Sequence, residues 1–152
     1  MSRFQTRIIL ESIPGRSIKQ NHFRLVQDLV YRTDVLPTEN IIRIEAPFDT
    51  DLGSIPRILW SIVGPPSGWY RDATIVHDWL CPRKDSSGVG VPHICDSDMA
   101  ADVFYEGMID VIQHSGWSKR IKRLRTRQAG IMRWAVRKYG PQFESDEWGG
   151  GA

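Results

Sequence analysis

Three amphipathic segments, separated by helix-breaking residues, fill the second half of this 152-residue chain and limit the folds open to it. In the first segment Ala73, Val76 and Leu80 recur at spacings of three and four, which places them on one face of a helix. Pro82 follows, and proline ends a helix because it lacks the N–H group that the next turn needs. The spacing therefore predicts a helix over residues 70–80.

The second and third segments carry start and stop signals of their own. Asp96 or Ser97 provides an N-cap for a helix over about 97–114. A third helix is predicted over about 118–139, where Gly140 and the proline after it stop the helical pattern. The partial apolar stripe of this third helix consists of Ile121, Leu124, Ile131 and Ala135.

The first half of the chain is rich in strand-forming residues. The stretches 22–33 and 41–50 are separated by the turn sequence LPTEN, which predicts a β-hairpin. A short helix is predicted around 57–62. The order of these elements indicates an α+β fold. In it the N-terminal hairpin is followed by an antiparallel helix pair, packed side by side, and by a third, basic helix.

The pattern predicts one domain over residues 22–140. Residues 1–21 show no periodicity and predict an arm or a loosely held edge, whereas 141–152 predict a flexible tail. We expect no membrane-spanning segment, because no run of about 18 apolar residues exists. We also expect no signal peptide, because the start of the chain lacks an apolar core.

Charge is distributed unevenly along the chain. Residues 119–138 hold nine of the 20 basic residues and no acidic residue. The rest of the chain therefore contains 11 basic and 18 acidic residues. A basic helix of this kind binds nucleic acid or anionic lipid, or it pairs with the acidic surface of its own protein. The sequence leaves these alternatives open, and a lipid or cell-envelope surface is the partner that we expect first.

The dipeptide His77-Asp78 places an imidazole on the apolar stripe of the first helix. Neighbouring helical residues point about 100° apart, which suits a histidine base beside a carboxylate that holds a cation. A histidine base needs a second group to fix its tautomer, and Asp102 of the next helix is the candidate. The alternative is a structural core histidine with Asp78 exposed. Asp102 also shares a stripe with Asp98 and Glu106, which is consistent with a solvated face.

Two further groups of residues offer metal or orienting chemistry. In FDTDLGSIPR, Asp51 and Ser54 either cap the helix that follows or place Asp51 near His77 as a ligand or orienter. A tetrahedral zinc site is a further hypothesis, to which buried, unbridged thiols are the alternative. The four candidate zinc ligands are His77, Cys81, His93 and Cys95.

The segments FDTDLGSIPR, ATIVHD, AADVF and YG resemble an uncharacterised domain family common in tailed phages and prophages. This resemblance runs from about residue 23 to 140. It implies phage origin and brings no established activity. We therefore expect a protein that is made in the host cytoplasm, with association with the virion as a further expectation.

The segments GPPSGWYRDATIVHDWL and AADVF are also similar to the core of viral and bacterial phospholipase A2 enzymes, over about residues 63–108. The similarity implies a calcium loop that contains Gly64 and Gly68. It also implies His77 as the general base, Asp78 as a calcium ligand and Asp102 as the partner of the histidine.

Two function hypotheses follow. The first is a phage-encoded, calcium-dependent hydrolase that acts on a phospholipid or another cell-envelope ester. The second is a non-enzymatic virion protein, such as a tail or baseplate component, that contacts other phage structural proteins and in which the His-Asp pair is structural. Binding of nucleic acid through 119–138 ranks third.

Overall fold

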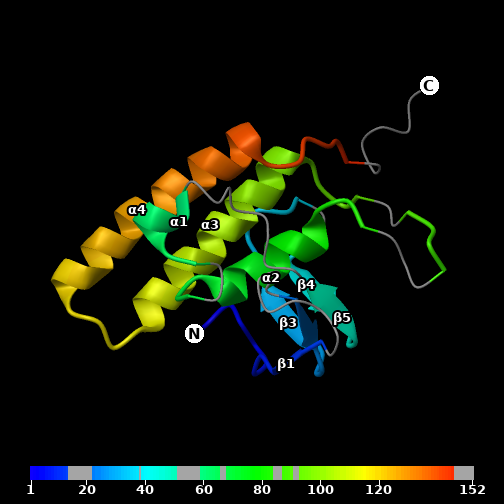
Figure 1. Cartoon of the computed structure of the whole chain (residues 1–152), viewed down its shortest axis with the longest axis horizontal. Coiled ribbons are helices and arrows are strands. Elements are labelled where there is room, and N and C mark those ends of the chain that lie inside the picture. The colour runs from blue at the N-terminus through cyan, green and yellow to red at the C-terminus, as the bar shows by residue number, and fades with distance from the viewer. Residues whose placement is uncertain are drawn as a thin grey trace.

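The computed structural model describes residues 1–13, 22–37, 39–50, 59–65, 68–83, 87–90 and 93–145. Short strands come first in the chain and helices follow, so the predicted α+β class is confirmed. Figure 1 shows α3 between α4 and α2, with the strands beyond α2. The elements are β1 Leu10–Ser12, β2 Phe23–Leu25, β3 Leu29–Arg32, β4 Ile41–Ile44, β5 Phe48–Thr50, α1 Trp60–Val63, α2 Arg71–Leu80, α3 Ser97–His114 and α4 Lys119–Tyr139.

The predicted hairpin is present, but it is interrupted in the middle. β2 pairs with β5 and β3 pairs with β4, both antiparallel, and one register runs from Phe23 opposite Thr50 to Arg32 opposite Ile41. At the interruption the Asp28 carboxylate accepts a hydrogen bond from the backbone N–H of Ala46. Each predicted strand is therefore two short strands.

One face of the hairpin is buried, as the alternation of side chains along its strands requires. In β4, Ile42 and Ile44 are buried whereas Ile41 and Arg43 are exposed. The buried isoleucines join a core cluster that also contains Ile75 of α2. The hairpin thus forms one layer of the fold and the helices form the other.

The helices α2 and α3 are antiparallel and tightly packed. A Cβ added at Gly107 would lie 3.1 Å from the Cβ of Ala73, and further along the pair the rings of His77 and Phe104 are 5.3 Å apart. Because Gly107 has no side chain, the two helices can approach closely at this point. The N-cap of α3 is Asp96, one of the two predicted candidates. The carboxylate of Asp96 accepts from the N–H of Met99 at 2.7 Å, and the N-cap of α4 is Ser118.

The apolar stripe predicted for the third helix is wrong in most of its members. In α4, Ile121, Leu124 and Ile131 are 41%, 54% and 40% exposed. Of the predicted stripe, Ala135 is buried. The residues of α4 that face the core are Ala129, Met132, Ala135 and Val136. The core-facing side therefore combines two alanines with Met132 and Val136, and Ile121, Leu124 and Ile131 lie outside it.

Residues from both ends of the chain pack against α3. β1 pairs with β2 as an edge strand, and the carboxylate of Asp110 accepts hydrogen bonds from the Ser2 hydroxyl at 2.8 Å and the Arg3 N–H at 3.0 Å. Near the C-terminus, the carbonyl of Phe143 accepts from the N–H of Ser97. Within the segments expected as an arm and a tail, residues 14–21 and 146–152 lie outside the described part of the chain.

Candidate functional site

His77 lies inside the protein, on the core face of α2. Its side chain is 2% exposed, and its ring packs 5.3 Å from that of Phe104. Its Nδ1 atom is 3.6 Å from the Sγ atom of Cys81, one helical turn later. Burial lowers the pKa of the imidazole from 6.5 to about 4, because the charged form would lose its hydration. His77 is therefore neutral at physiological pH.

Asp102 is not the partner of this imidazole, although it was expected to be. Its carboxylate accepts from Nε of Arg133 at 2.7 Å and lies 2.6 Å from Nη2 of the same guanidinium. Phe104 points toward α2, and a residue two positions earlier on a helix points about 200° away. Among the described residues, His77 and Asp102 face different neighbours and no hydrogen bond joins them.

The acidic stripe of α3 is paired rather than merely solvated. Asp98 lies against Arg137, as Asp102 lies against Arg133. Further along the helix, Glu106 accepts from the Tyr31 hydroxyl at 3.0 Å. Residues four apart are displaced slightly around the helix, so the stripe winds around α3. Asp98 and Asp102 therefore pair with the basic helix, whereas Glu106 bonds to the N-terminal strands.

Asp78 contacts the hairpin. Its Oδ2 atom accepts from the hydroxyl of Thr50, at the end of β5, at 2.5 Å. This bond ties the last turns of α2 to the strand that precedes residues 51–58. Two further candidates from the sequence, Asp51 and Ser54, lie outside the described residues.

The residues expected to bind calcium lie in different parts of the structure, before α2 and near its end. Gly64 and Gly68 precede α2, whereas Asp78 lies seven residues beyond its start, about 10 Å along the helix axis. The carbonyl of Gly64 accepts from the Tyr70 hydroxyl at 2.7 Å, and that of Gly68 accepts from the Arg71 N–H at 3.2 Å. Both carbonyls thus serve local structure at the end of α2 that is remote from Asp78.

The four expected zinc ligands are also distributed among different contacts. His93 packs against Phe143, with ring centroids 5.0 Å apart, and its Nδ1 atom is 3.2 Å from the carbonyl oxygen of Glu144. Cys95 is fully buried, which raises the pKa of its thiol to about 12. Within the described segments, no group of three or more His, Cys, Asp or Glu side chains is placed to hold a metal ion.

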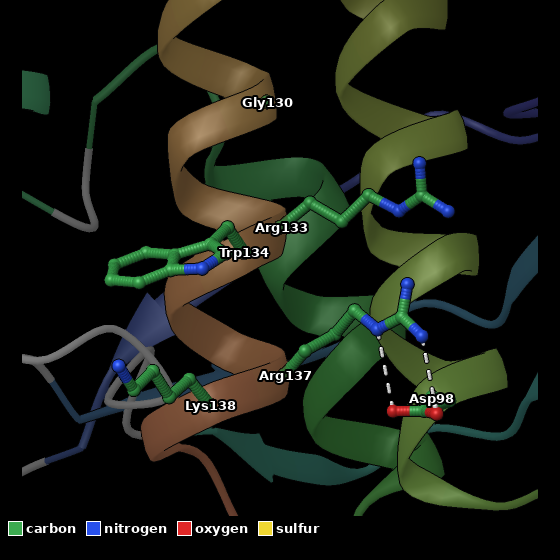
Figure 2. A pocket seen from close by; sticks show the side chains of 6 residues that line it. All are labelled: Asp98, Gly130, Arg133, Trp134, Arg137 and Lys138. Carbon is green, nitrogen blue, oxygen red and sulfur yellow. Dashed lines mark hydrogen bonds and ion pairs between the residues drawn. The ribbon is translucent and has the colours of Figure 1, made fainter.

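The surface feature that the sequence analysis missed is the outward face of α4. Leu124, Ile131 and Trp134 are 54%, 40% and 53% exposed on it. Beside them a groove of about 540 Å³ is lined by α4 and the first turn of α3 (Figure 2). Its lining residues are Asp98, Gly130, Arg133, Trp134, Arg137 and Lys138. The signal in the sequence is the partial apolar stripe of the third helix, which includes Leu124 and Ile131.

Residues 23–122 match a protein family described as "Protein of unknown function (DUF1353)". The chain belongs to the DUF1353 family. A protein of Sinorhizobium fredii, "Uncharacterized protein y4jT", is 30% identical over 94 residues, which cover 61% of this chain but only 22% of that protein. No solved structure matches the chain. The DUF1353 match contains β2–β5 and α1–α3 but ends four residues into α4, so most of the outward face of α4 lies beyond it.

Proposed function

We propose that this DUF1353 protein is a non-enzymatic docking domain, and that the outward face of α4 attaches it to an anionic phospholipid surface. The observation that carries the proposal is a stripe of three cationic and three apolar side chains, intermixed along the solvent side of that helix. We call this set the α4 stripe. It consists of Arg120, Leu124, Arg127, Ile131, Trp134 and Lys138.

The geometry of the α4 stripe suits a flat surface. Its members follow one another at spacings of four and three, so they lie in one row about 27 Å long. All six are exposed. Tryptophan favours the boundary between water and lipid, and long basic side chains lay their aliphatic stems on apolar surface while their charges stay in water. A row that mixes the two kinds of residue therefore suits the depth at which the lipid phosphates lie.

The charge of α4 selects an anionic partner. No acidic residue occurs between Lys119 and Tyr139, and the carboxylates that answer this helix, Asp98 and Asp102, lie on its inner edge. Each Lys or Arg close to an anionic membrane contributes about 1 kcal/mol of attraction. A second copy of this helix would instead place cation against cation. No helix within the described residues is both long and apolar enough to cross a bilayer.

The contacts of the His-Asp pair support a structural role for it. The imidazole of His77 is 2% exposed and contacts Cys81, and the carboxylate of Asp78 holds Thr50. A phospholipase A2-like hydrolase, the first hypothesis from the sequence, needs a histidine that reaches both water and a carboxylate. In the setting implied by the phage-like motifs, the docking surface is the lipid of the host envelope.

Co-sedimentation with vesicles tests the proposal. The protein should bind phosphatidylcholine vesicles that contain phosphatidylglycerol, should not bind pure phosphatidylcholine, and should release as salt increases. The double variant Arg120→Gln/Arg127→Gln should bind roughly 30-fold more weakly, because two contributions of about 1 kcal/mol are lost. The matched control is Arg7→Gln/Arg43→Gln, which removes the same charge from exposed positions of the N-terminal strand region.

Three results would contradict the proposal. Absence of binding to the anionic vesicles would exclude lipid docking. An equal loss in the two double variants would show attraction by net charge without a specific face. Release of fatty acid from the same vesicles in the presence of calcium, abolished by His77→Gln, would favour the hydrolase.

A further inference from the structure

We propose that the groove beside the α4 stripe receives the phosphate headgroup of a single phospholipid. This inference rests on the proposed function and makes it more specific, because it gives one lipid a defined place on the helix. The groove has a volume of about 540 Å³ and is open to solvent along α4.

The α4 side chains that line the groove point in two opposite directions (Figure 2). Arg133 and Arg137 point toward α3, and the guanidinium of Arg137 is bonded there to Asp98. Trp134 and Lys138 point the other way, with the Lys138 ammonium 5.1 Å from the centre of the indole ring. The groove thus has a guanidinium side and an aromatic side.

Gly130 keeps the head of the groove open. A glycine inside an α-helix lowers helix stability relative to alanine, so its presence calls for a reason in packing or in close approach. A Cβ added at Gly130 would meet nothing within 4 Å, so no neighbour in the described chain requires the glycine. At Gly107, by contrast, the Cβ of Ala73 is 3.1 Å away. The missing side chain at Gly130 instead leaves the helix backbone accessible to a ligand.

The charge of the groove favours a phosphate. Three cations, Arg133, Arg137 and Lys138, line the groove with one acidic residue, Asp98. Asp98 pairs with Arg137, and Asp102, which does not line the groove, pairs with Arg133, so one positive charge remains in excess. The ion pair between Arg137 and Asp98 spans 3.2 Å, but the two side chains are 42% and 58% exposed, so water screens it. A phosphate can therefore share the guanidinium, whose planar donors match two phosphate oxygens at once.

The aromatic side of the groove favours a lipid over another phosphate compound. Trp134 belongs both to the groove and to the α4 stripe, so a headgroup in the groove would have its glycerol and upper acyl chain beside the indole. Tyr139 extends this apolar side, with its ring 5.8 Å from that of Trp134. The phosphate of the lipid and its glycerol and upper acyl chain would then contact neighbouring turns of the same helix.

Filling the groove without a change of charge is the test that separates this inference from general docking. Gly130→Val removes the open space and keeps every cation, and it should reduce the affinity for phosphatidylglycerol vesicles at least tenfold. Gly130→Ala should give a smaller loss. The control is Thr126→Val, which places the same β-branched valine one turn earlier, at an exposed position that does not line the groove. Circular dichroism at equal temperature confirms that each variant is folded.

The outcomes distinguish the two proposals. If the unmodified protein binds vesicles and Gly130→Val binds equally well, the groove inference is wrong and docking through the α4 stripe stands. If the unmodified protein does not bind anionic vesicles, both are wrong. A loss that is as large for Thr126→Val as for Gly130→Val would also overturn the inference, because the effect would not be specific to the groove.

Nuclear magnetic resonance identifies the ligand directly. A soluble, short-chain phosphatidylglycerol should shift the amide signals of residues 130–138 and the indole N–H of Trp134, with saturation. Inorganic phosphate should shift the same signals far more weakly. Equal affinity for inorganic phosphate would contradict the inference and make a free phosphate the ligand of the groove. Tighter binding of an acidic peptide, seen at the same signals, would also contradict it and make a protein the partner.

Discussion

Protonation of His77 should destabilise the folded protein. Burial lowers the pKa of its imidazole to about 4, whereas in the unfolded chain the pKa returns to 6.5. Between these values the unfolded chain binds a proton that the folded protein does not, so the free energy of unfolding falls as the pH decreases. The contribution of neutral His77 is complete above about pH 6.5 and is lost progressively toward pH 4. The effect amounts to about 2 kcal/mol at pH 5 and to about 3 kcal/mol when fully developed.

Urea unfolding at about pH 7.5 and about pH 5 measures this effect. Carboxylates also titrate in this range, so the informative quantity is the difference between the unmodified protein and His77→Gln, which is neutral at both pH values. We expect the variant to be less stable at neutral pH, because a packed ring is lost, but to lose about 2 kcal/mol less on acidification. His93→Gln, at a half-buried position near the C-terminal segment, is the matched histidine control.

Two results would refute this argument. One is an equal loss of stability on acidification in His77→Gln and in the unmodified protein. The other is a proton titration, followed by nuclear magnetic resonance, that gives His77 a pKa near its ordinary value in the folded protein. A buried imidazole that kept its ordinary pKa would need a carboxylate partner to offset the effect of burial, which would restore support for the hydrolase hypothesis.

Further predictions concern the packing and the thiols. Asp102→Asn should cost at most about 1 kcal/mol of stability in urea, and less at high salt, because the ion pair with Arg133 is about one-third exposed; a loss above about 3 kcal/mol would contradict this. Gly107→Val should lower the free energy of unfolding by about 1–3 kcal/mol, because its side chain would press on α2, and an unchanged melting temperature would be inconsistent with the packing. Both cysteines are unbridged, so a thiol reagent followed by mass spectrometry should modify half-buried Cys81 in the folded protein and Cys95 only after unfolding; modification of Cys95 first would contradict its burial.

The bounds of the helices were readable from the sequence because the signals that set them are local. The Asp96 side chain caps the N–H of a residue three positions later, and Pro82 and Gly140 stop helices through their own backbone chemistry. Helices predicted over 70–80 and 97–114 are found at Arg71–Leu80 and Ser97–His114. The alternation of buried and exposed side chains along the hairpin strands is also a local signal, because it depends on neighbouring residues of one strand. Its interruption in the middle was not predicted.

Which neighbour each face meets was decided only by the tertiary structure. Periodicity shows that residues share a face, but it does not show which element covers that face, because this depends on how the helices pack together. Asp102 was expected to reach His77, yet it lies on the side of α3 that meets Arg133 of α4. The larger aliphatic residues of α4 were expected in the core. α4 instead packs through Ala129, Met132, Ala135 and Val136, and Leu124 is exposed beside the cations of the helix. The sequence alone determined where the helices begin and end, whereas the packing of α4 on α3 decided that a predicted core stripe became a surface.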